Sequence, residues 1–132
     1  MIAQVLKVHE EYVYVLTRYG SIYGKLHSNA VEISKMYNIE IDADDIVSNQ
    51  DIAKSNIENA SIYTQKNYVF FNGFVESVED DLLFLRLGED IIMFAVEDAK
   101  YCKKYTSQFV AIKTHNVNMF DTGVRIGPET AL

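Results

Sequence analysis

The stretch VFFNGFVESVEDDLLFLRLGEDIIMFAVEDAKYCKKY, residues 69–105, decides the fold of this chain. Three runs rich in apolar and β-branched residues are separated by short turns that carry Glu, Asp and Gly, a pattern typical of consecutive antiparallel strands. The strands are predicted at residues 69–78, 82–87 and 91–96. A short helix is predicted after the third strand, over residues 97–105.

The start of the chain repeats this order of elements. Two β-rich runs, residues 2–8 and 12–17, form a predicted hairpin, and a weaker third strand follows at residues 21–26. Gly24 interrupts the third strand, which predicts a bulge or a bend in the sheet. A shift of about 69 positions aligns this meander with the later one. Either an internal duplication or the chance similarity of two meanders explains the match.

The remaining elements are weaker in the sequence. Ser28 stands where a helix N-cap is expected, and apolar residues follow at helical spacing, so a helix is predicted before Asn38. These apolar residues are Val31, Ile33, Met36 and Tyr37. The polar, acidic segment 42–67 is expected to hold one or two short helical turns, the clearest over residues 49–56. Further strands are predicted at residues 108–114, 117–120 and 124–126.

These elements predict a single, mainly β domain over residues 1–132, with coiled antiparallel sheets or a small barrel and two short helices. Two repeat units, residues 1–41 and 68–127, are joined by the segment 42–67 in this interpretation. The second unit resembles an OB-type barrel in the order of its elements, with a helix between the third and fourth strands. Oligonucleotide binders of that class use basic and aromatic residues on the sheet, whereas this half of the chain is acidic.

The amino-acid composition excludes or disfavours several classes of function. The chain has 12 basic and 19 acidic residues among 132, a formal net charge of −7, and 48% hydrophobic residues, enough to bury a core. Nucleic acid is disfavoured as a partner because its binders carry a basic face, whereas an acidic surface suits a basic protein. The single cysteine, Cys102, excludes an internal disulfide. Without a leader-like or membrane-spanning apolar run, the protein is predicted to be cytoplasmic.

Residues that carry chemistry do not converge in the sequence. His9, His27 and His115 lie in or beside predicted turns, without the spacing that brings two metal ligands onto one face. Residues 42–53 begin like a calcium loop but lack its glycine and its final glutamate. A phosphate-binding loop and a nucleophile elbow are also missing. We therefore predict a non-enzymatic protein that uses neither a metal nor a cofactor.

Carboxylates at the predicted turns are the candidate partner-binding residues. The first and third turns of a meander lie at the same end of the sheet, so two acidic groups are expected to cluster there. Tyr12 and Tyr14 share one strand face and are candidate interface anchors, although Leu16 continues their face and favours a place in the core. The candidate set consists of Glu79, Asp80, Asp81, Glu97, Asp98, Glu10, Glu11, Tyr12 and Tyr14.

The preferred functional interpretation is a small acidic inhibitor, such as a bacterial immunity protein or antitoxin, that binds and blocks a basic toxin, for example a nuclease. Its carboxylates would replace the substrate's phosphates at the toxin's lysines and arginines.

Two alternatives remain open. An OB-like module for nucleic acid or a small ligand requires basic residues to converge beside exposed aromatic side chains. These basic residues are Lys100, Lys103, Lys104, Lys113 and Arg125. A structural subunit of a phage or secretion assembly requires instead an exposed apolar edge and self-association. The oligomeric state itself is not predicted.

Overall fold

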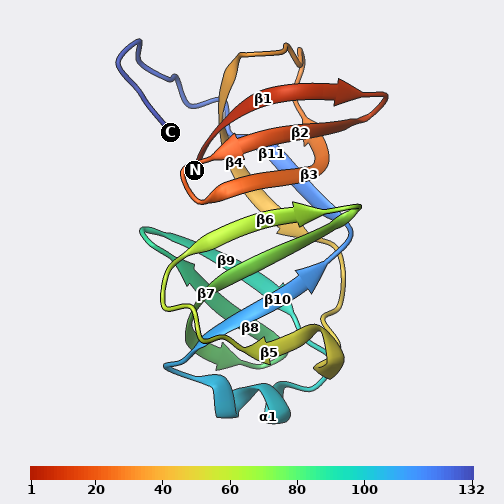
Figure 1. Cartoon of the computed structure of the whole chain (residues 1–132), viewed down its shortest axis with the longest axis vertical. Coiled ribbons are helices and arrows are strands. Elements are labelled where there is room, and N and C mark those ends of the chain that lie inside the picture. The colour runs from red at the N-terminus through yellow and green to blue at the C-terminus, as the bar shows by residue number, and fades with distance from the viewer.

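Eleven β-strands, one short α-helix and two 3-10 turns make up the chain, and the computed structural model describes all residues from Met1 to Leu132 (Figure 1). The strands are β1 (Ile2–His9), β2 (Tyr12–Thr17), β3 (Gly20–His27), β4 (Met36–Ala43), β5 (Ile52–Lys54), β6 (Ser61–Gln65), β7 (Tyr68–Glu79), β8 (Leu82–Leu87), β9 (Asp90–Ala95), β10 (Phe109–Thr114) and β11 (Val117–Asp121). The helical elements are η1 (Asn49–Asp51), α1 (Ala99–Cys102) and η2 (Lys103–Tyr105). The predicted mainly β class is confirmed.

The strands form two lobes along the longest axis of the molecule (Figure 1). We name them after their places in that view: the upper lobe is β1 to β4 with β11, and the lower lobe is β5 to β10 with α1. The upper lobe is a closed barrel of five strands. In it β1, β2 and β3 form an antiparallel meander, β4 pairs with β1, and β11 pairs parallel with β3 and antiparallel with β4.

This order, with the last strand between the third and the fourth, is that of an OB-type barrel. The small barrel was predicted, but its strands come from the first half of the chain and from β11 near the C-terminal end. The order expected within residues 68–127, with a helix between the third and fourth strands, is confirmed as β7, β8, β9, α1 and β10, but the next strand, β11, belongs to the upper lobe.

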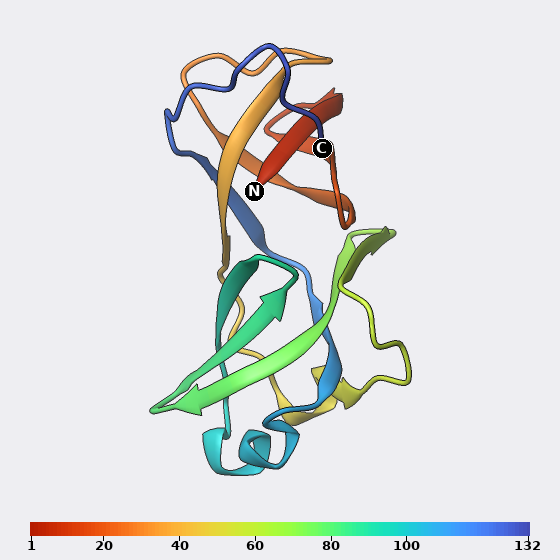
Figure 2. The same cartoon turned by 90° about the vertical axis from the view of Figure 1, so that its left-hand side faces the viewer.

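The lower lobe contains the second meander, β7 to β9. The long strand β7, which crosses the lobe diagonally in Figure 2, pairs with β6 and β10 through its first part and with β8 through its second. β10 also pairs with β5, and Val47 forms a parallel bridge with Val96 directly after β9. The segment from Val47 to β5 thus has the place that β11 has in the upper lobe. Each lobe is completed by a strand from the other half of the chain.

The two meanders correspond in register. Each first strand has one bulge, and the two bulges lie 70 positions apart, between Val5 and Lys7 and between Val75 and Ser77. The predicted shift of about 69 positions would match the buried Val13 with Leu82, which is 37% exposed, and a one-residue slip exchanges the faces of a strand. The alignment is therefore corrected by one residue, while an origin by duplication stays a prediction.

A continuous sheet joins the lobes where β3 meets β6. Gly20 bridges to Ile62, whose N–H donates to the Tyr19 carbonyl oxygen at 2.8 Å. The Tyr23 N–H donates to Oγ1 of Thr64 at 3.1 Å. A Cβ atom on Gly20 would lie 1.7 Å from the Ile62 oxygen. The junction therefore requires glycine at this position.

Buried apolar side chains form one cluster of 28 residues with members in both lobes. Strand alternation supplies them: Val13 and Val15 of β2 are 3% and 0% exposed, and their neighbours point outward. In the lower lobe the rings of Phe71 and Phe94 meet edge to face with centroids 5.4 Å apart. Burial of such a ring contributes about 1.5–3 kcal/mol, so this contact fixes β7 against β9.

The helix predicted between Ser28 and Asn38 is wrong. Residues 28–35 form a loop, and β4 begins at Met36. The Ser28 hydroxyl donates to the Asp121 carboxylate instead of capping a helix, and the Tyr37 hydroxyl donates to the Ala30 carbonyl at 2.6 Å. Tyr37 pairs with Ala3 of the neighbouring strand β1. Closure of the barrel by a distant strand has overridden the local helical spacing.

Other elements were predicted with mixed success. The helix at residues 97–105 is confirmed as α1 and η2, and Asp98 caps it by accepting the Tyr101 N–H at 3.0 Å. Residues 49–56 form η1 and then β5 rather than a helical turn alone, and residues 124–126 are not a strand. Gly24 is not at a bulge, since it lies in the regular ladder with β2. Its Cβ would lie 2.4 Å from the Val117 oxygen, so glycine admits β11 here.

Candidate functional site

A groove of about 890 Å³ lies where β4 of the upper lobe faces β9 of the lower lobe, on the side of the molecule seen in Figure 2. Apolar residues supply 11 of its 16 lining positions. Its polar lining residues are Asn38, Glu40, Asp42, Asp90 and Thr122. The groove therefore combines an apolar floor with carboxylates.

One wall of this groove is the free edge of β9. β9 pairs with β8 along its whole length, and only its last residue has a partner on the other side, where the Val47 N–H donates to the Ala95 oxygen at 2.8 Å. Alternate residues of a strand direct their backbone groups to the same side. Ile91 and Met93 therefore direct their N–H and C=O groups away from β8. Their side chains are 56% and 55% exposed.

The carboxylates of the groove differ in their engagement. Asp90 accepts a hydrogen bond from the Tyr19 hydroxyl at 2.8 Å and lies 3.5 Å from the amino group of Met1. Burial, together with Asp90, raises the pKa of Tyr19. Glu40 and Asp42 are exposed on β4 and take part in no ion pair. No lysine or arginine lines the groove, so these two carboxylates are available to an incoming cation.

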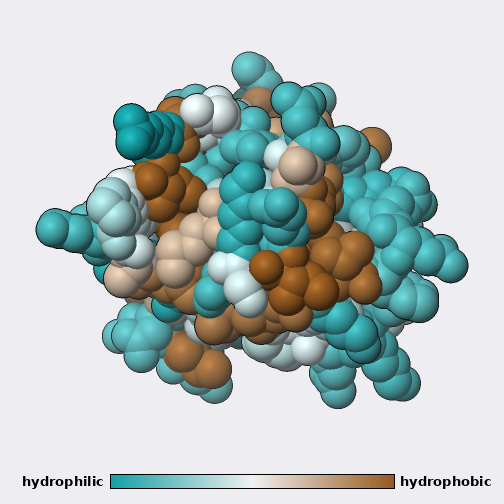
Figure 3. All heavy atoms as spheres, turned by 90° about the horizontal axis from the view of Figure 1, so that it is seen from above, coloured by the Kyte–Doolittle hydropathy of each residue, from teal (hydrophilic) through white to brown (hydrophobic).

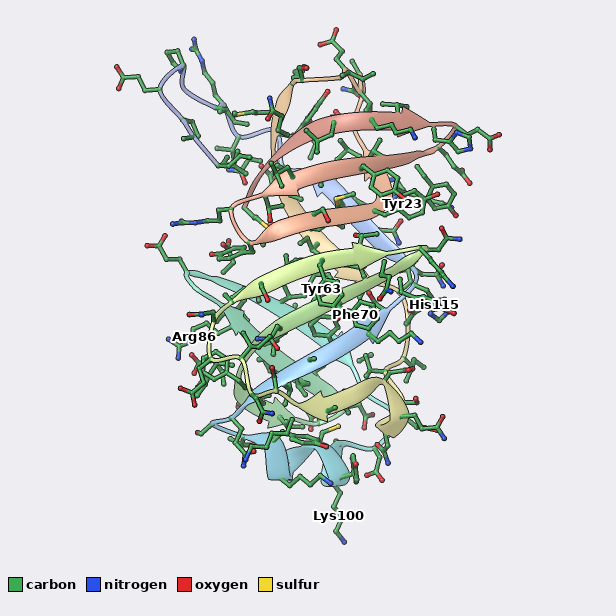
Figure 4. All side chains as sticks on the ribbon, viewed as in Figure 1. Tyr23, Tyr63, Phe70, Arg86, Lys100 and His115 are labelled. Atoms are coloured by element: carbon green, nitrogen blue, oxygen red, sulfur yellow. The ribbon has the colours of Figure 1, made fainter.

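A second surface carries tyrosines. Tyr12 and Tyr14 of β2 lie on the outer face of the upper lobe, so the favoured core placement is wrong: Val13 and Val15 face the core instead. Tyr23 of β3, labelled in Figure 4, stacks on Tyr12 with centroids 5.1 Å apart and lies 4.7 Å from the Tyr14 ring. The structure thus makes both predicted anchors part of a half-buried aromatic cluster on the outer face of the upper lobe.

A shallower hollow of about 490 Å³ adjoins the tyrosines and spans both lobes. It is lined by Tyr12, Tyr23, Lys66, Asn67, Tyr68 and His115. The Lys113 ammonium lies 4.1 Å from the centre of the Tyr68 ring, and Lys25 lies 5.5 Å from that of Tyr12. In Figure 4 the labelled Tyr63 and Phe70 lie next to this region, and their rings stack at 4.7 Å. We call the surface formed by Tyr12, Tyr14, Tyr23 and the adjoining hollow the tyrosine face.

The predicted acidic turns of the lower lobe do lie together. The Val96 N–H donates to the Asp81 carbonyl at 2.9 Å, which places the turn Glu79, Asp80, Asp81 beside Glu97 and Asp98. However, the Asp98 carboxylate caps α1, and that short helical segment also carries three lysines, of which Lys100 is labelled at the bottom of Figure 4. This end of the molecule therefore has mixed charge.

The remaining predicted residues lie on the other lobe. Glu10 and Glu11 form the turn between β1 and β2, and Glu11 lies 3.6 Å from the Lys25 ammonium. Tyr12 and Tyr14 follow directly on β2. The nine candidate residues thus make two separate groups, one on each lobe (Figure 1), rather than one surface.

The basic residues named for the nucleic-acid alternative do not converge. Lys100, Lys103 and Lys104 lie on α1 and η2 at the end of the lower lobe, Lys113 lies on β10, and Arg125 follows β11. That form of the alternative is wrong because its cations lie in three places. Of the five, Lys113 lies beside the tyrosine face, together with Lys25 and Lys66.

The apolar surface of the upper lobe is seen from above in Figure 3, where brown side chains form a band between hydrophilic margins. Exposed apolar side chains of this lobe are Leu6, Val8, Leu16, Ile33, Phe120 and Val124. An exposed apolar surface is what the structural-subunit alternative requires.

The residues that could bind a metal ion or undergo redox chemistry are the His, Cys, Asp and Glu side chains. The structure has no group of three or more His, Cys, Asp or Glu side chains arranged to hold a metal ion. Cys102 is 1% exposed, and its burial raises the pKa of the thiol. None of the helical segments has the length and apolar character needed to cross a bilayer.

Comparison with protein-family models, with curated proteins and with solved structures finds no match to this chain. Sequence reasoning missed Glu40, Asp42, Ile91 and Met93. One signal was present: the run DIIMFA of β9 has apolar side chains on both faces, although only Ile92 and Phe94 are needed for the core.

Proposed function

We propose that the protein is a non-catalytic inhibitor that covers a basic surface of another protein, in the manner of bacterial immunity proteins and antitoxins. The observation that carries the proposal is the groove between β4 and β9. It offers exposed apolar side chains and the unpaired carboxylates of Glu40 and Asp42, and its cationic group, the Met1 amino group, lies beside Asp90 instead.

The charges of the chain support a basic partner. A net charge of −7 attracts a cationic protein over several ångströms, and such attraction raises the association rate. Apolar contact then supplies the affinity that exposed ion pairs alone do not, because surface ion pairs contribute about 0–1 kcal/mol each. Ile91 and Met93 provide that contact in the groove.

The groove suits this role better than the acidic turns of the lower lobe. Asp98 is engaged in capping, and the lysines of α1 and η2 partly neutralise the neighbouring carboxylates. The turns have no comparable apolar floor. We assign them a supporting part in long-range attraction, together with Glu10 and Glu11.

A photo-crosslinking amino acid at position 93 tests the proposal in the cells that produce the protein. The matched control carries the same group at position 63, because Tyr63 on β6 is 50% exposed and does not line the groove. We expect a basic protein to be crosslinked at position 93 and not at position 63. Once purified, that basic protein should lose its activity when an equimolar amount of the present protein is added. Capture of an acidic protein, or of one that stays fully active, would contradict the proposal.

A second candidate function is favoured by the tyrosine face. Stacked aromatic rings with lysines beside them are the surface that binds single-stranded nucleic acid in OB-type barrels, with about 1–3 kcal/mol per stacked base. Fluorescence anisotropy of a labelled oligothymidylate tests it, with Tyr23→Ala as the variant and Tyr101→Ala, on the distant helix, as the control. Equal binding by both variants would exclude the tyrosine face as the binding surface.

A further inference from the structure

We propose that the groove binds its partner by strand addition: an extended segment of the partner, with basic and apolar residues in alternation, pairs with the free edge of β9. This inference rests on the proposed function and specifies how the same site recognises its partner.

The backbone of β9 provides the hydrogen bonds. Ile91 and Met93 each present one N–H and one C=O to the groove, and no backbone group of the chain pairs with them. The open part of the edge runs from Asp90 to Phe94, before Val47 covers Ala95. At about 3.3 Å per residue, an extended segment of roughly five residues fits this length.

Backbone of the chain meets the outer edges of β1 and β6, whereas the edge of β9 is open from Asp90 to Phe94. The outer edge of β1 receives the loop before β4, where the Val5 N–H donates to the Lys35 oxygen at 3.0 Å and the Ser34 N–H donates to the Val5 oxygen at 2.7 Å. The outer edge of β6 is met by β3. Soluble proteins protect open edges with lysine, proline or a bulge. β9 has none of these, and its outward side chains Ile91 and Met93 are apolar.

The wall opposite β9 defines the side chains of the partner. Glu40 and Asp42 lie two residues apart on the outer face of β4. Their spacing along the strand is therefore about 6.6 Å, which equals the spacing of alternate side chains in an added strand. Two lysines or arginines at alternate positions meet these carboxylates, while apolar residues contact Ile91 and Met93.

The same charges argue against a second copy of this chain as the occupant. Pairing of two β9 edges about a two-fold axis would bring Glu40 and Asp42 of both copies together, and no lysine or arginine lines the groove to offset them; Asp90 is already paired with the Met1 amino group. Like charges in such proximity oppose association. The groove thus selects a basic partner rather than itself.

The probe for this inference is a blocked synthetic peptide in which lysine and valine alternate. Titration into the ¹⁵N-labelled protein should shift the amide resonances of Ile91 and Met93 and slow their hydrogen exchange. N-methylation of the peptide at every second residue removes the donors on one edge only. One N-methylated peptide should lose binding, and the peptide methylated in the other register should keep it.

Protein variants complete the test. Met93→Pro removes an outward donor without affecting the ladder to β8, and it should weaken binding at least about tenfold, the ratio expected for the loss of one or two backbone hydrogen bonds. A thermal melt verifies that the variant is folded. The control is Tyr63→Ala on β6, because β6 is paired with β7 and a proline there would disturb the sheet. The pair Glu40→Gln and Asp42→Asn should weaken binding and reduce its dependence on salt.

The outcomes separate the two proposals. Binding that is lost on charge neutralisation but unchanged in Met93→Pro overturns strand addition and leaves the proposed function standing. Shifts confined to the acidic turns at Asp80 and Asp81 overturn strand addition in the same way. Binding that neither variant changes contradicts both strand addition and the proposed use of this groove. Association of the free protein into dimers through β9, measured by sedimentation, would overturn the choice of a basic partner.

Discussion

The Tyr19 hydroxyl donates a hydrogen bond of 2.8 Å to the Asp90 carboxylate and so connects the two lobes across 71 positions of sequence. Tyr19 lies in the turn between β2 and β3, and Asp90 is the first residue of β9. A Cβ atom on Gly88, in the turn before β9, would lie 2.7 Å from the same hydroxyl, so a side chain there would displace the Tyr19 hydroxyl. This contact positions the start of the β9 edge against the upper lobe.

Loss of that hydrogen bond should loosen the junction. Tyr19→Phe keeps the ring but leaves Asp90 without its donor, so the free energy of unfolding should fall by about 1 kcal/mol. Urea denaturation measures the change. Tyr63→Phe, at an exposed hydroxyl with no hydrogen bond within the protein, is the matched control and should unfold like the parent protein. Equal stability of all three would show that the contact is energetically silent.

The same residue predicts a dependence of stability on alkaline pH. Burial, and then the hydrogen bond to Asp90, raise the pKa of Tyr19 in the folded protein above its ordinary value of 10.0. The stability that neutral Tyr19 contributes is therefore fully present below pH 10.0 and is lost as the pH rises through the folded-state pKa. The difference between the parent protein and Tyr19→Phe should shrink over this range in thermal melts. A constant difference would contradict the assignment.

Gly20 should tolerate no side chain. Gly20→Ala places a Cβ 1.7 Å from the Ile62 oxygen at a φ of +137°, so we expect a loss of about 3 kcal/mol or more and separation of β3 from β6. The control is Gly123→Ala, which has a positive φ of +74° but no atom within 4 Å of the added carbon. Strain alone should cost it about 1 kcal/mol. Similar melting temperatures for the two variants would refute the close approach.

On β11, which closes the upper barrel, substitutions of the adjacent residues Met119 and Phe120 should differ in their effect on stability. Met119 of β11 is 0% exposed, whereas Phe120 is 42% exposed and stacks on His27. Met119→Ala should destabilise the protein by about 2–5 kcal/mol, as for other large-to-small core changes, and Phe120→Ala by less than about 1 kcal/mol. Hydrogen exchange should show loss of protection in β3 and β4 first for Met119→Ala. Loss confined to the lower lobe would contradict the exchange of strands between halves.

The meanders were predictable because their signals are local. Val13, Val15, Leu83 and Leu85 alternate with outward residues, and polar turns separate the runs, so period two identified both sets of strands. β4 was not predictable in this way. Its apolar residues also suit a helix, and the choice is made by Ala3, which pairs with Tyr37 34 positions away.

The candidate site was harder to predict than the fold. Acidic turns were recognised and do cluster at one end of the lower lobe, but the groove depends on which strand edge remains unpaired. The pairing of the β9 edge is set by the positions of Val47 and β4 beside it. Both are distant in sequence, so the residues of β9 do not indicate whether its edge is open. Tyr12 and Tyr14 show the related difficulty that alternation identifies two faces of a strand without telling which face is buried when both are apolar.

A comparison of two charge changes decides between the groove and the acidic turns as the contact surface. Glu40→Gln with Asp42→Asn and Asp80→Asn with Asp81→Asn each remove two negative charges, so both should slow association with the crosslinked partner to a similar extent at low salt. Only the groove pair should also raise the dissociation rate, because only its carboxylates would contact the partner in the complex. Surface plasmon resonance measures both rates. Faster dissociation from the Asp80 and Asp81 pair would instead restore the originally predicted turns as the binding site.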